Sequence, residues 1–123
     1  TSDFVSFEER PTAIARGGAS ERDLLVGAGS VLRADDGTFV AFYGGINPAR
    51  AGHGLPTQVV MRATSTDLVH WEKDPDWELV ADPRWYEADD WRDPFVYRDG
   101  ETWRMIVCTR VRTGPHDRRG AIG

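Results

Sequence analysis

The chain has 123 residues, of which 40% are hydrophobic and 28% are charged, and its formal net charge at pH 7 is −5. This length and composition predict at most one domain of ordinary globular character. The negative charge argues against nucleic acid or an anionic membrane as a partner. The sequence has no apolar run of roughly 18 residues that would span a membrane, and its single cysteine, Cys108, leaves no internal disulfide.

Short β-rich runs separated by turn signals predict one antiparallel sheet between residues 27 and 80. Its four strands are expected near 29–34, 38–44, 57–64 and 67–73. A glycine- and proline-rich stretch over 44–56 predicts a long loop, and Pro75 is expected to end the fourth strand. Because no long segment has the apolar spacing of an amphipathic helix, we expect no helix longer than two turns in this span.

A second hairpin is predicted around the turn signal Asp99-Gly100, between the apolar runs 95–97 and 103–107. Arg92-Asp93-Pro94 stands directly before the first of these runs. Proline lacks an N–H group and suits the first residue of a strand, so Asp93 is expected at the mouth of that strand. A carboxylate beside a guanidinium can bind a polyol there; the alternative interpretation is a surface ion pair.

The beginning of the chain is repeated 64 residues later. The matching pairs are Asp3/Asp67, Val5/Val69, Glu8/Glu72 and Pro11/Pro75. Four short strands in a repeated unit are typical of a β-propeller blade, which cannot bury both of its faces without neighbours. We therefore predict an all-β fold in which residues 1–14 end one blade, 27–80 form a full blade and 91–123 begin the next. A β-sandwich is the alternative fold.

A family resemblance rests on three segments: residues 65–72, residues 29–44 and Arg92-Asp93-Pro94. Together they resemble glycoside hydrolase family 32, the five-bladed β-propeller fructosidases that include invertase, levanase and inulinase relatives. Residues 65–72 are similar to that family's Ser-x-Asp-Leu-x-x-Trp blade segment, and residues 29–44 resemble its second blade. Arg92-Asp93-Pro94 matches its Arg-Asp-Pro motif. The resemblance implies a fragment of a five-bladed β-propeller, from the end of the first blade to the start of the third.

In that family the aspartate of Arg-Asp-Pro binds sugar hydroxyls and stabilises the transition state, which implies this catalytic role for Asp93. Retaining hydrolysis also needs a nucleophile and an acid/base carboxyl group about 5–5.5 Å apart. The nucleophile's position falls before residue 1, and Cys108 follows Val107 and not the glutamate of the family's Glu-Cys motif. We expect the chain alone not to cleave sucrose or fructans, and the rest of the propeller or another chain to complete its blades.

Four further residues are predicted to bind substrate: Arg92, Trp91, Ser30 and Asn47. Trp91 adjoins the motif and can stack on a sugar ring, with core packing as the alternative. Ser30 follows the position where the family carries an aromatic-Ser pair, here replaced by Gly27-Ala28. Asn47 lies in the long loop, where it is either a rim contact or a turn residue.

The acidic run Glu87, Asp89 and Asp90 precedes the motif. It allows a calcium site, a supporting role behind the substrate contacts, or simply a solvated loop. The histidines do not have metal-ligand spacing, and we expect neither a metal nor a cofactor.

Three functions are left open by the sequence. The first is part of a retaining glycoside hydrolase with a fructoside as its carbohydrate partner. The second is a non-catalytic carbohydrate-binding propeller fragment. The third is a related propeller enzyme, such as an arabinan- or xylan-type hydrolase or a mannoside phosphorylase.

Overall fold

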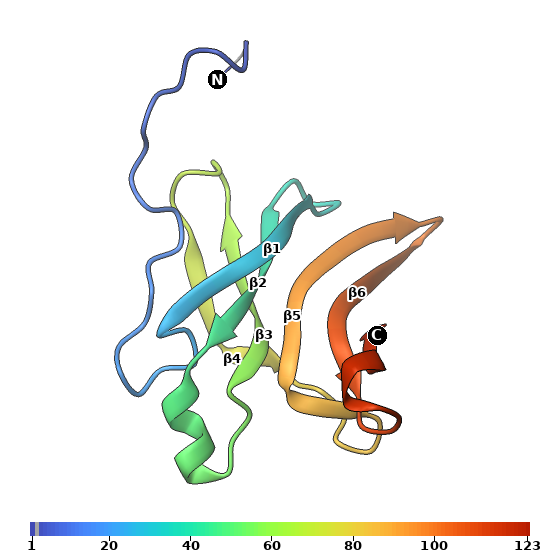
Figure 1. Ribbon diagram of the computed structural model, residues 1–123. Coiled ribbons are helices and arrows are strands. Elements are labelled where there is room, and N and C mark those ends of the chain that lie inside the picture. The colour runs from blue at the N-terminus through green and yellow to red at the C-terminus, as the bar shows by residue number, and fades with distance from the viewer. Residues whose placement is uncertain (2) are drawn as a thin grey trace.

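A computed structural model describes residues 1 and 3–123, and its regular structure is almost entirely antiparallel β-sheet (Figure 1). The first sheet contains, in spatial order, β1 (Leu25–Arg33), β2 (Phe39–Ile46), β3 (Gln58–Ser65) and β4 (Glu72–Leu79). The second contains β5 (Tyr86–Asp99), β6 (Thr102–Val111) and β7 (Gly120–Ile122). Two short 3-10 helices, η1 (Pro48–His53) and η2 (His116–Arg118), follow β2 and β6. Neither is long and apolar enough to cross a membrane, and the described residues form no other helix.

The first sheet is an antiparallel meander of four strands, as the sequence predicts, but its fourth strand is displaced. The prediction of a strand at 67–73 is wrong, because β4 begins only at Glu72. The preceding residues form a turn in which the Asp67 carboxylate accepts two backbone N–H groups. Pro75 lies inside β4 and does not end it, which is tolerated because β4 is at the edge of this sheet.

The second sheet differs from the prediction at β5, which begins at Tyr86 and continues through the Arg-Asp-Pro motif. The pairing of β5 with β6 shifts between Arg92 and Phe95, so the motif forms a β-bulge. A bulge accommodates proline because its extra residue needs no partner in the ladder. The prediction that Asp93 lies at the mouth of a strand is therefore wrong: it lies at a bulge within β5, and Pro94 behind it is fully buried.

The two sheets pack face to face, with β1 and β5 side by side (Figure 1). A buried cluster between the sheets contains Val60, Ala81, Trp91 and Val107. A second buried cluster, within the first sheet, contains Tyr43, Val59, Met61 and Ala63. Arg98 of β5 also pairs with Asp35 after β1 at 2.6 Å. One complete sheet thus packs against a second through an apolar face, as neighbouring blades do.

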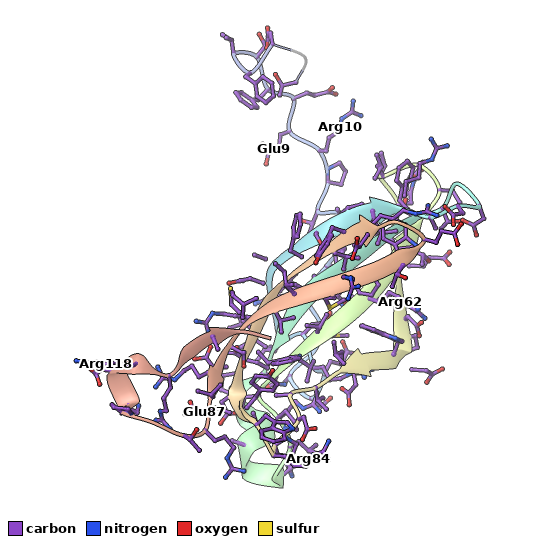
Figure 2. The ribbon with its side chains drawn as sticks, turned by 90° about the vertical axis from the view of Figure 1, so that its right-hand side faces the viewer. Glu9, Arg10, Arg62, Arg84, Glu87 and Arg118 are labelled. Atoms are coloured by element: carbon purple, nitrogen blue, oxygen red, sulfur yellow. The ribbon has the colours of Figure 1, made fainter. Side chains whose placement is uncertain are left out.

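The segment before β1 has no strand between residues 3 and 24. Its first part extends away from both sheets, as the labelled Glu9 and Arg10 show in Figure 2. Its last part is fastened by Asp23, which is buried and contacts the Tyr43 hydroxyl at 3.1 Å and the Lys73 ammonium at 2.6 Å. The assignment of residues 1–14 to the end of a preceding blade stays a prediction.

Candidate functional site around Asp93

Asp93 has an unusual backbone at the β5 bulge. Its φ is 55°, in the left-handed region that residues other than glycine rarely adopt. Among residues other than glycine, aspartate is one of the few that are enriched in this region. Such strained positions cost about 1–3 kcal/mol and cluster at functional sites, so the bulge itself marks Asp93 as a candidate.

The Asp93 carboxylate is free to accept hydrogen bonds. Its side chain is 46% exposed, and it makes no hydrogen bond with any residue that the structure describes. Its ion-pair partner is Arg92, whose Nε lies 3.7 Å from Oδ2, which is beyond normal hydrogen-bond length. Both carboxylate oxygens can therefore receive hydroxyl groups of a ligand.

The Arg92 guanidinium is shared with a second carboxylate. Its Nη1 group forms a close ion pair with Oδ1 of Asp90, whose side chain is only 15% exposed. The other oxygen of Asp90 lies 3.6 Å from Nε of Arg110. Arg110 in turn contacts Glu87 at 3.1 Å, and Glu87, labelled in Figure 2, also binds Arg119 at 2.8 Å. A network of alternating negative and positive side chains is thus connected to Asp93 through Arg92.

This network accounts for part of the acidic run before the motif. Glu87 and Asp90 are held by arginines, and Asp89 accepts both the N–H and the hydroxyl of Thr57, at 3.2 and 2.6 Å. Across residues 1 and 3–123, no three His, Cys, Asp or Glu side chains are grouped so as to hold a metal ion. The run therefore links strands and loops through ion pairs and hydrogen bonds.

Trp91 is placed in the core and not on the surface beside Asp93. It is 7% exposed and packs in the cluster between the sheets, with its ring 5.3 Å from that of Tyr86. Its indole nitrogen is buried and has no partner among the described residues. The structure favours core packing of Trp91 over the sugar stacking that the sequence suggested.

Ser30 and Asn47 make contacts of different kinds. The Ser30 hydroxyl accepts the N–H of Val96 at 3.0 Å, and so joins β1 to β5 just beyond the bulge. Asn47 is 1% exposed, and its amide donates to the carbonyl groups of Ala19 and Glu21 at 2.9 and 2.6 Å. Its oxygen also accepts the first N–H of η1, so its polar groups are used within the protein.

Of the five predicted site residues, the structure brings Arg92 and Asp93 together and sets Ser30 against the same strand. Trp91 and Asn47 lie in buried surroundings that serve the fold. The sequence analysis treats Asp90 only as part of the acidic run, although its spacing from Arg92 indicates a contact between the two side chains. Asp90 and Arg92 are two residues apart, and side chains at that spacing share one face of a strand.

The chain forms two stacked antiparallel sheets whose first strands are adjacent, and its sequence repeats after 64 residues. These features define it as part of a β-propeller. The chain belongs to glycoside hydrolase family 32, because the model of the Glycosyl hydrolases family 32 N-terminal domain matches residues 1–117. The search of curated proteins finds no match to the chain. The resemblance seen in the motifs is confirmed, and the all-β structure fits a fragment of that propeller domain.

Proposed function

We propose that the chain is part of a hydrolase that acts on fructosides of the sucrose or fructan type with retention of configuration, and that Asp93 stabilises its transition state. The observation that carries the proposal is the free carboxylate of Asp93, held at a strained bulge in the Arg-Asp-Pro segment of a family 32 chain. Arg92 stands beside it and is proposed to contribute to substrate binding.

The chemistry explains why a free carboxylate is useful at this position. As a glycosidic bond breaks, the sugar ring acquires oxocarbenium-like charge and its hydroxyl groups become better hydrogen-bond donors. Bonds from those hydroxyls to Asp93 then strengthen in the transition state, which is the condition for a faster chemical step. The bulge fixes where the backbone of Asp93 stands in β5, and the carboxylate makes no hydrogen bond to the described part of the chain that would have to break at the moment of reaction.

The nucleophile and the acid/base are proposed to lie on parts of the propeller outside this chain. The three carboxylates just before Asp93 do not suit either role, because Asp90 and Glu87 are bound by arginines and Asp89 is bound by Thr57. The same observation supports a second candidate function, in which this part binds carbohydrate without cleaving it. The family match favours fructosides over the arabinan, xylan and mannoside alternatives.

The test is the kinetics of Asp93→Asn in the whole protein, with fructose release from sucrose and from inulin as the readout. We expect kcat to fall by about 10²-fold or more, with a smaller change in KM, because the lost contact strengthens in the transition state. Asp99→Asn is the matched control, since Asp99 is on the same strand but is paired with Arg104 at 2.6 Å. A near-wild-type kcat for Asp93→Asn contradicts the role of Asp93, and a wild-type protein inactive on both sugars contradicts the fructoside assignment.

A further inference from the structure

We propose that Asp90 is a positioning residue, which holds the Arg92 guanidinium and thereby keeps the Asp93 carboxylate free for substrate. The inference rests on the proposed function of Asp93. It concerns a side chain that is not expected to touch the sugar.

The geometry places one guanidinium between two carboxylates. Nη1 of Arg92 forms the close pair with Asp90, whereas Nε lies 3.7 Å from the Asp93 carboxylate. A guanidinium binds a carboxylate most strongly through two parallel N–H groups directed at its two oxygens. Arg92 does not reach that arrangement with Asp93, because its position is set by the residue on the other side.

Of the two carboxylates near the Arg92 guanidinium, Asp90 is more buried and has more partners than Asp93. Its side chain is 15% exposed, against 46% for Asp93, so its ion pairs are less weakened by water. Arg110 approaches its second oxygen at 3.6 Å and is itself fixed by Glu87 and by the carbonyl group of His116 at 2.5 Å. Asp90 is thus also held through the oxygen that does not bind Arg92.

Loss of the Asp90 charge would leave Asp93 as the carboxylate closest to Arg92 along β5. A side-chain movement of about 1 Å would shorten the 3.7 Å separation to an ordinary charge-assisted hydrogen bond. The new ion pair would occupy oxygens that the sugar hydroxyls need, and it would have to break before each substrate molecule binds. The new ion pair would stabilise the free enzyme relative to both the substrate complex and the transition state. It should therefore raise KM and leave kcat nearly unchanged.

The test is steady-state kinetics of Asp90→Asn in the whole protein, with sucrose and inulin as substrates. We expect KM to rise by about tenfold while kcat stays within about twofold. Asp90→Glu restores the charge and should return KM toward the wild-type value. Asp82→Asn is the matched control: Asp82 pairs with Arg84 at the same spacing, at 2.5 Å, in the segment before β5, and its loss should leave KM unchanged.

A double-mutant cycle separates positioning from a general structural effect. If Asp90 acts through Arg92, the substitution Asp90→Asn should have no further effect on KM in an Arg92→Gln background. Additive losses in the cycle would overturn the inference. Thermal unfolding of each variant verifies that it is folded, and Asp90→Ser replaces Asp90→Asn in the cycle if the latter does not fold.

The two proposals can fail separately. If Asp93→Asn lowers kcat but Asp90→Asn leaves KM unchanged, the inference about Asp90 is wrong and the function proposed for Asp93 stands. If Asp93→Asn leaves kcat unchanged, the proposed function is wrong, and the inference fails with it.

Discussion

Asp3 and Asp67 form the same hydrogen-bonded turn 64 residues apart. In each, Oδ1 accepts the backbone N–H groups two and three residues ahead, at 2.8–2.9 Å. The next residue has a positive φ in both turns, 57° at Phe4 and 65° at Leu68. A hydroxyl group two residues before each aspartate completes the arrangement. The sequence repeat is therefore also a repeat of structure.

The two turns lie in different surroundings, although their internal bonds match. Trp71, which follows the second turn, packs against the buried cluster of the first sheet. Phe7, its counterpart in the repeat, is 75% exposed on the segment that extends from the sheets. The turn forms from local hydrogen bonds alone and needs no packing, as expected of side-chain-to-backbone bonding by aspartate and serine.

The first prediction concerns the pH dependence of stability. Hydrogen bonds from the His70 ring and from the N–H groups of His70 and Val69 hold the pKa of Asp67 well below its usual value of 3.8. A carboxyl group whose pKa is lower in the folded state stabilises the fold above the unfolded-state pKa, and this contribution is lost as pH falls through the lowered value. We expect Asp67→Asn to lower the unfolding temperature near pH 6, and the difference from wild type to shrink toward pH 2.

The control for this prediction is Asp3→Asn. Hydrogen bonds from the N–H groups of Ser6 and Val5 lower the pKa of Asp3 to about 2, but this turn is not packed on either sheet. The Asp67 turn joins β3 to β4, but the Asp3 turn belongs to neither sheet, so its hydrogen bonds do not depend on whether the sheets are folded. The pKa of Asp3 is then the same before and after the sheets unfold, and Asp3→Asn should leave the unfolding temperature unchanged at every pH. A difference between wild type and Asp67→Asn that stays constant from pH 6 to pH 2 contradicts the argument.

The second prediction concerns Gly29, which stands at the bulge in β1 and 64 residues before Asp93. A Cβ atom at Gly29 would lie 2.0 Å from the Phe42 carbonyl oxygen, which is a backbone atom of the paired strand. We expect Gly29→Ala to destabilise the protein by about 3 kcal/mol in chemical denaturation, because the strands would have to separate. Gly44→Ala is the control: its Cβ would make an ordinary contact at 3.7 Å, and we expect a change of less than about 1 kcal/mol. Equal effects of the two substitutions would show that the bulge is not the cause.

The third prediction separates a structural role of Ser30 from the substrate contact that the sequence suggested. Ser30→Ala removes the acceptor for the Val96 N–H group and weakens the link between β1 and β5. We expect a loss of about 1 kcal/mol in unfolding free energy. The KM for sucrose is measured on the same variant, and we expect it to change by less than about threefold, since the observed bond is internal. Unchanged stability together with a large rise in KM reverses the assignment.

The sequence predicted most strands correctly because β-rich runs and Asp-Gly turns act over a few residues. The prediction was wrong where side-chain hydrogen bonds or a bulge, and not residue type, decide the backbone conformation. Leu68 and Val69 favour a strand by residue type, but the Asp67 carboxylate binds the backbone N–H groups that a strand would need. Proline at position 94 is compatible both with the first residue of a strand and with a bulge, and only the pairing of β5 with β6 shows that it lies at a bulge.

The candidate site was predictable only in its motif. Arg92 and Asp93 are adjacent in the chain, so their proximity follows from the sequence alone. The burial of Trp91 depends on a sheet that packs over it from the other half of the chain, and that of Asn47 depends on a segment 26 and 28 residues away. The link between Asp90 and Arg92 becomes visible only when β5 is seen to begin before the motif.

The last prediction uses the backbone of Asp93 to separate stability from activity. A residue other than glycine pays roughly 1–2 kcal/mol in the left-handed region, whereas glycine adopts a φ of 55° without strain. We therefore expect Asp93→Gly to be more stable than Asp93→Ala by about 1 kcal/mol in chemical denaturation, since both lack the carboxylate and differ in the strain. Both variants should show kcat lowered by about 10²-fold or more on sucrose or inulin, because activity follows the carboxylate and not the backbone. If Asp93→Gly kept its activity, the bulge would be the functional feature and not the carboxylate. If Asp93→Ala were as stable as Asp93→Gly, the strain at the bulge would have to be relieved elsewhere in β5.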